Sequence, residues 1–259
     1  MQPTVSFHAV TKCGGLLAPF YYFYFPIHQL DVADFFRFFP ILVYTESAIY
    51  QMDEENEIGL KGESEEHCEI LCDILRKQGL FDEKIEEEFS RGMEYYEMES
   101  AMRSGMSFTD EDVVRASRSK CFDVRVLHRL LFRMLEKPYD EDLLETLWVL
   151  EALADAEDDI RQYKIDVERN VFNAYHLFVK LYGKDGKKRI REHTTSLEQE
   201  YLTTIAEYPS ETQQQYAKLW EGYRAIVPRP EIPEPILSCG RFSDLAWLFR
   251  DDSVEPSRR

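Results

Sequence analysis

The sequence predicts an all-α protein that folds as a single helical bundle. The 259 residues include only 11 Gly and 11 Pro, which is too few for a turn-rich β-sandwich or barrel. Apolar residues recur at helical spacing along most of the chain, and the strict alternation typical of β-strands is scarce. Hydrophobic residues make up 44% of the chain and aromatic residues 14%, which is enough to build one large core.

The chain divides into an amino-terminal arm (1–29), a helical domain (30–250) and a polar tail (251–259). Within the arm, the segment 14–27 (GGLLAPFYYFYFPI) comes closest to a signal sequence. It is rich in aromatic residues and has neither a basic start nor a small-residue cleavage site, so we expect a packed arm. The chain contains no apolar run long enough for a transmembrane helix, so the sequence predicts none.

The first half of the domain contains a series of helical patterns with recognisable starts. Residues 30–57 form a helical stretch in which Pro40 is expected to start or kink a second piece. Further helices are predicted over 65–77 and, with Asp82 as a cap, from there to about residue 104. Thr109 and Asp112 resemble a capping pattern, so the next helix is expected to run over 111–136.

The second half begins with the longest uninterrupted helical pattern, over residues 140–170. A strongly apolar helix over 170–182 follows and ends at Gly183. Two more helices are expected over roughly 187–207 and 210–226, before a proline-rich link and a short last helix from Ser243. Helices joined by such short links indicate one bundle.

Charge and cysteine content exclude several classes of function. The chain has 49 acidic and 31 basic side chains, for a net charge of -18, so its average field repels the phosphate backbone of nucleic acids. The 5 cysteines are odd in number and lack the spacing of a disulfide framework. The sequence therefore predicts a cytoplasmic protein without a nucleic-acid partner.

Acidic residues of the helix over 140–170 share one face. Glu151, Asp155, either Asp158 or Asp159, Gln162 and Asp166 step by three or four positions. If this face points inward, its carboxylates need a cation, and Mg²⁺ suits a site with few carboxylates and a phosphate-bearing substrate. The alternative is an acidic stripe in contact with solvent.

A second acidic cluster ends the helical stretch over 30–57. Glu46, Tyr50, Asp53 or Glu54, and Glu57 again fall on one face, after an apolar segment. Two such helices facing each other across a bundle would enclose an apolar pocket below a metal-binding mouth. Taken alone, this cluster is also typical of a solvated helix end.

These acidic segments resemble motifs of class I terpene synthases and trans-isoprenyl diphosphate synthases. The segment DDIRQYKID is similar to the second metal motif of the terpene synthases, with Gln162 standing where that motif has Ser or Thr. The segment from Asp155 to Asp159 is also similar to the second aspartate-rich segment of the isoprenyl diphosphate synthases, and the cluster around Asp53 to a degenerate form of the first. The resemblance implies a central apolar cavity and Mg²⁺ as cofactor. It implies the metal ligands Asp53, Glu54, Glu57, Asp158, Gln162 and Asp166.

Basic residues complete the implied site. Arg115, Arg118 and Lys120 lie where that superfamily places cationic contacts to diphosphate, and Arg241 lies about where many bacterial cyclases carry an Arg-Tyr pair. Lys180 opens a basic stretch that is either a lid over the diphosphate or a solvated loop. Asn173 is expected either to face the same cavity or to act as a cap.

The implied function is Mg²⁺-dependent cyclisation of a linear isoprenyl diphosphate, such as farnesyl diphosphate, with release of diphosphate. In that reaction Arg115 and Arg118 would assist ionisation and the ring of Tyr50 would stabilise positive charge. Two alternatives remain open, a trans-prenyl diphosphate synthase and a non-catalytic helical interaction protein. The sequence also leaves a homodimer open.

Overall fold

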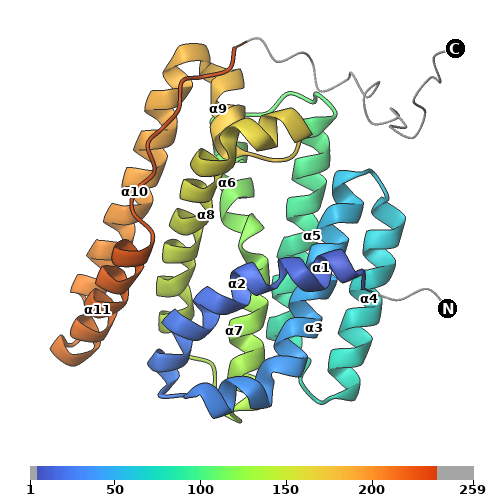
Figure 1. Cartoon of the computed structure of the whole chain (residues 1–259), viewed down its shortest axis with the longest axis vertical. Helices are drawn as coiled ribbons and strands as arrows, with labels where there is room; N and C mark the ends of the chain where they lie inside the picture. Colours follow the sequence, from blue (N-terminus) through green and yellow to red (C-terminus); the bar gives the residue numbers. More distant parts are fainter. Residues whose placement is uncertain (1–4, 238–259) are drawn as a thin grey trace, which may run out of the picture.

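The computed structural model describes residues 5–237, and over this range the chain is helical and contains no β-strand. The predicted all-α class is confirmed. Figure 1 shows the helices packed side by side, with the amino-terminal arm across one face of the bundle. The principal helices of the described range are α3 (Val32–Glu57), α4 (Lys61–Lys77), α5 (Glu83–Arg103), α6 (Asp110–Lys120), α7 (Phe122–Met134), α8 (Glu141–Arg169), α9 (Ala174–Tyr182), α10 (Gly186–Ala206) and α11 (Ser210–Ile226).

The amino-terminal arm is itself helical and packs on the bundle. It consists of α1 (Phe7–Lys12), α2 (Gly14–Pro19), the π-helix η1 (Phe20–Tyr24) and the 3₁₀-helix η2 (Phe25–His28). Phe20 and Phe25 of this arm are buried in the core. At the other end of the arm, α1 packs against α3, so the arm contacts two parts of the bundle.

Helix starts agree well with the predicted caps. Asp82 accepts hydrogen bonds from the backbone at the start of α5, and Thr109 with Asp112 forms a capping box at the start of α6. Pro40, by contrast, lies inside a continuous α3 and does not divide it. The apolar first half and the acidic end of α3 therefore belong to one continuous helix.

The predicted helix over 111–136 is wrong in one respect, because the chain breaks at Cys121 into α6 and α7. The break places Lys120 at the carboxyl end of one helix and Asp123 in the first turn of the next. Asn170 ends α8 in the left-handed conformation, and α9 begins only at Ala174. Both interruptions lie beside the site described below.

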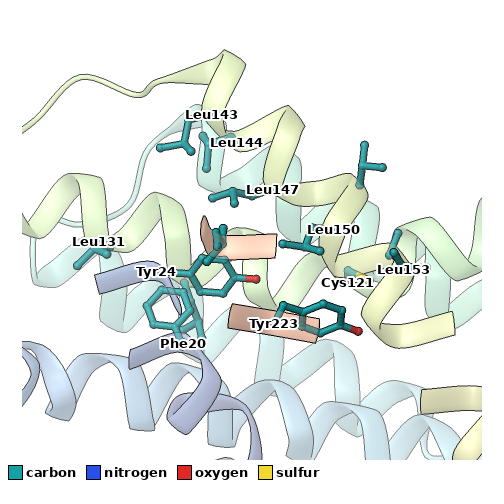
Figure 2. Packing of buried hydrophobic residues seen from close by; sticks show 14 of the residues in the cluster. Phe20, Tyr24, Cys121, Leu131, Leu143, Leu144, Leu147, Leu150, Leu153 and Tyr223 are labelled. Carbon is teal, nitrogen blue, oxygen red and sulfur yellow. The ribbon is translucent and has the colours of Figure 1, made fainter. Parts of the chain in front are cut away.

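Two groups of buried side chains form the core. One joins the arm to α8 and α11, and Figure 2 shows Leu147 and Leu150 of α8 near Phe20 and Tyr24 of the arm. The other joins the second half of α3 to α5, α7 and α9. α8 contributes to both groups, so it presents two different faces to the interior.

Among the described residues, no helix combines the length and the hydrophobicity needed to cross a bilayer. The predicted helix from Ser243, the polar tail and Arg241 lie outside the described residues.

Candidate functional site

Carboxyl groups from several helices meet in one region of the bundle, which we call the acidic interior. The hydroxyl of Tyr95 in α5 locates it, because burial raises the pKa of this phenol and the nearby carboxylates of Glu99, Asp53, Asp155 and Asp159 raise it further. The second acidic helix end and the acidic face of α8 therefore approach the same side chain. The acidic interior consists of Glu46, Asp53, Glu57, Glu99, Asp123, Asp155 and Asp159.

Lys120 is the central cation of this region. Its ammonium group lies 2.8 Å from Asp155 and 3.0 Å from Asp159, and it also lowers the pKa of Asp53 on α3. The backbone break after Lys120 ends α6 at this point. One ammonium group thus contacts two carboxylates of α8 and lies near enough to α3 to act on Asp53.

Asp159 is held rigidly within the acidic interior. Its side chain is almost fully buried and accepts a hydrogen bond of 2.7 Å from the backbone nitrogen of Ala174 as well as the contact from Lys120. The same backbone group belongs to the first residue of α9, so the start of that helix fixes the carboxylate. Burial nevertheless raises the pKa of Asp159.

Glu46 has the least compensated carboxyl group. It is fully buried on α3, and neither of its oxygens has a hydrogen-bond partner among the described residues. Burial, followed by the neighbouring Asp123 and Asp53, raises its pKa far above the usual value. Burial therefore favours the neutral form of Glu46 unless a cation lies beside it.

The other carboxyl groups are also held as weak acids. Burial raises the pKa of Asp123, Asp155 and Glu99 to about 7 and that of Glu57 to about 8. Neighbouring carboxylates raise each of these pKa values further. The carboxylate of Asp53, for example, raises the pKa of both Glu99 and Glu57. Carboxyl groups outnumber the cations around them, so the region favours an added positive charge.

The amino-terminal arm lies against the outer edge of this region. Lys12 of α1 lies 3.8 Å from Asp53 and 4.6 Å from the ring centre of Tyr50. His8 lies 3.1 Å from Glu54, so α1 covers the acidic end of α3 with its own polar side chains. The Glu54 side chain therefore points toward α1 at the surface.

The structure separates the residues that the sequence grouped on α8. Asp159, one of the two alternatives left open at that turn, lies inside, whereas Asp158 and Gln162 are exposed on another side of the helix. Asp166 is partly buried and accepts a hydrogen bond of 2.8 Å from Asn173. Burial raises the pKa of Asp166 to about 6.

Asn173 caps α9 and joins two helices. Its side-chain oxygen accepts from the backbone of His176, and its amide nitrogen donates to the backbone oxygen of Asp159 and to Asp166. The cap expected as one alternative is therefore present. Asn173 is buried at the edge of the acidic interior.

The basic residues predicted for diphosphate do not lie together. Arg115 is exposed and pairs with Asp112, and Arg118 pairs with Glu200 of α10. Both line an outer cavity of about 480 Å³, whereas Lys120 contacts the acidic interior. Lys180 is exposed on α9. Among the predicted cations that the structure describes, Lys120 is therefore the one that contacts carboxylates of the acidic interior.

Several residues of the acidic interior were not anticipated as site residues. Glu99 lies one turn after the aromatic Tyr95 on α5, and this helical spacing was available as a signal. Asp123 gave no signal, because its position depends on the helix break at Cys121, which no Gly or Pro marks.

Within residues 5–237, no group of three or more His, Cys, Asp or Glu side chains has a geometry ready to hold a metal ion. No protein-family model, curated protein or solved structure matches the chain.

Proposed function

We propose that the acidic interior binds Mg²⁺ and that the protein is a class I terpene cyclase. Its substrate would be a linear isoprenyl diphosphate, such as farnesyl diphosphate, and its products a cyclic terpene and diphosphate. The observation that carries the proposal is that Lys120, a partly buried cation, contacts two carboxylates of α8 and lowers the pKa of Asp53 on α3. The resemblance of the two acidic segments to terpene synthase metal motifs implies such a grouping of carboxylates and cations.

The carboxyl groups suit a hard divalent cation. Both oxygens of Glu46 and one oxygen of Asp155 are buried without a hydrogen-bond partner among the described residues. Mg²⁺ is usually bound by one or two carboxylates and completes its shell with water and substrate phosphate, so a preformed cage of three ligands is not required. We assign Asp53 and Glu57 on α3, and Asp155 and Asp159 on α8, as the candidate ligands.

The chain's own cations would then act on the substrate. Lys120 would exchange its contacts with Asp155 and Asp159 for contacts with the diphosphate, where its charge favours departure of the anion. Mg²⁺ supplies further stabilisation of the leaving diphosphate. Lys12, beside Asp53, is a second ammonium group within reach of the same region.

Aromatic side chains border the acidic interior. Tyr95 and Tyr96 are almost fully buried, and Lys120 already lies 5.7 Å from the ring centre of Phe172. Ring faces attract positive charge, and buried walls exclude the water that would capture a cationic hydrocarbon. Tyr50, which is covered by Lys12, belongs to the same wall.

Incubation with farnesyl and geranylgeranyl diphosphates in the presence of Mg²⁺, followed by gas chromatography, tests the proposal. A cyclic hydrocarbon or alcohol is expected, and chelation of Mg²⁺ should abolish it. A product that forms only after isopentenyl diphosphate is added would instead identify a chain-elongating prenyltransferase. No product under any of these conditions would contradict both enzymes and leave a helical interaction protein.

The variant Asp53→Asn should lower product formation at least about a hundredfold, because it removes one charge from the α3 ligands without changing their shape. Its melting temperature should stay within a few degrees of the parent, since Asp53 is partly solvent-exposed. The matched control is Asp73→Asn, which removes an exposed carboxylate paired with Lys77 on α4. Equal activity of the two variants would contradict the assignment.

A further inference from the structure

A separate cavity of about 380 Å³ lies between η1, α8 and α11. Phe23 and Tyr24 form one wall, Leu150 and Ala154 another, and Tyr223 a third. Figure 2 shows Tyr24, Leu150 and Tyr223 close to one another. The cavity adjoins the face of α8 that carries Asp158, whereas Lys120 contacts the face that carries Asp155 and Asp159. It is therefore distinct from the acidic interior.

The polar atoms of these walls already have partners. The hydroxyl of Tyr223 donates to Glu157 over 3.0 Å, and the hydroxyl of Tyr24 faces the buried Glu151. The surfaces left to a ligand are mainly carbon, because they come from aromatic faces and aliphatic side chains. Such walls favour a hydrocarbon body.

The mouth of the cavity offers one acceptor and one donor. Asp158 is exposed and has no ion pair with another described residue. Arg161 uses its Nη2 for bonds to Glu157 and to the backbone oxygen of Pro228, at 3.3 and 3.0 Å. Its other N–H groups have no hydrogen-bond partner among residues 5–237 and are available to a ligand. The two residues are three positions apart on α8 and so lie side by side.

Formal charge at the mouth is balanced. Glu157 contacts both Arg161 and Arg224, and the adjacent Asp158 supplies the second negative charge. A fatty-acid carboxylate would meet Asp158, and an ammonium head would meet Arg161, so a charged head is disfavoured either way. A hydroxyl matches the pair, because it can donate to the Asp158 carboxylate and accept from the Arg161 guanidinium.

We infer that this cavity is a binding site for a neutral alcohol with a hydrocarbon chain or ring. Its volume lies near the lower end of the roughly 300–1,000 Å³ typical of small-molecule pockets, so the ligand is a single small amphiphile. The inference does not depend on the proposed cyclase reaction, since it uses neither diphosphate nor Mg²⁺.

Displacement of the neutral fluorescent probe N-phenyl-1-naphthylamine by 1-decanol tests the site directly, in Mg²⁺-free buffer. The full-length protein should bind the probe saturably and release it to 1-decanol. Ala154→Phe, which fills the cavity from α8, should weaken probe binding at least tenfold, whereas the matched variant Ala206→Phe, at an exposed position of α10, should not. Equal binding by both variants, or no saturable binding by the parent, would overturn the inference.

The alcohol head is tested by Asp158→Ala, a variant of an exposed residue that should fold normally. Affinity for 1-decanol should fall about fivefold to tenfold, because a hydrogen bond to a charged group is lost. Affinity for 1-methoxydecane, which has no hydroxyl to donate, should not change. The control Asp73→Ala, at an exposed position, should change the affinity for neither ligand. Equal losses for both ligands, or none, would overturn the assignment of an alcohol.

Discussion

Among single residues, Lys120 contributes most clearly to charge compensation in the acidic interior. Its ammonium group contacts two carboxylates of α8 and acts on a third from α3. The two contacted carboxylates would otherwise repel each other, and the ammonium charge compensates both of them. Removal of this residue would leave buried negative charge uncompensated.

We therefore expect Lys120→Met to lower the free energy of unfolding by about 2 kcal/mol at pH 8, measured by urea denaturation. Millimolar Mg²⁺ should restore more stability to this variant than to the parent, because the cation replaces the lost charge. Lys188→Met, which breaks an exposed pair with Glu192 on α10, is the control and should change stability by less than about 0.5 kcal/mol.

The carboxyl groups also predict how stability depends on pH. The folded-state pKa values of Asp123, Asp155 and Glu99 are about 7 and that of Glu57 is about 8, above their unfolded values. The folded state therefore binds more protons than the unfolded state, and stability falls as pH rises through these values. Without divalent cations, we expect a loss of about 2 kcal/mol between pH 6.5 and 8.5.

Histidine titration works in the opposite direction but at lower pH. Burial lowers the pKa of His128 to about 3 and that of His28, His176 and His193 to about 4, so protonation in acid favours unfolding. The two effects oppose each other between about pH 4.5 and 6, so stability should be highest in that range. Denaturation midpoints across this range measure the profile, and Asp123→Asn should flatten its alkaline side. A stability that is constant or rises from pH 6.5 to 8.5 would contradict the assigned pKa values.

At the scale of elements, the close approach of α9 and α10 depends on Gly186. A Cβ atom at this position would lie 2.6 Å from the Cα of Val179, a backbone atom that cannot rotate away. Gly186→Ala should therefore cost about 2 kcal/mol of stability by separating the two helices. Gly62→Ala, near the start of α4 with nothing within 4 Å, should instead stabilise by about 0.5 kcal/mol. Thermal unfolding compares the two, and equal effects would argue against this packing.

Local sequence signals were sufficient to predict the helices, but they did not predict which side chains face the site. Capping residues such as Asp82 and Thr109 act on their own helix, so they were sufficient to locate helix starts. The choice between Asp158 and Asp159 depends on which side of α8 meets α9, where the backbone of Ala174 contacts Asp159. That is tertiary information, and helical spacing alone leaves both positions open.

At the scale of the whole molecule, the bundle combines a strongly negative chain with an interior that needs positive charge. The formal net charge of -18 counts every carboxyl group as ionised. Because burial raises the pKa of Glu46 and Asp123, the folded chain carries less negative charge near neutral pH than this figure. Helical periodicity left two possibilities open for the acidic faces of α3 and α8, a shared interior and contact with solvent, and the structure places carboxylates of both helices near Tyr95. Glu99 and Asp123 join them only because α5 packs against α7 and the chain breaks between α6 and α7.

We expect the carboxyl groups of the acidic interior to bind divalent cations. Calorimetric titration of Mg²⁺ into the full-length protein with inorganic pyrophosphate at pH 7.5 tests it most directly. We predict a saturable binding heat beyond that of Mg²⁺ with pyrophosphate alone, with release of protons because carboxyl groups must ionise. The Asp53→Asn variant should lose most of this heat. Identical titrations for the two proteins, or no heat beyond the protein-free control, would contradict the claim.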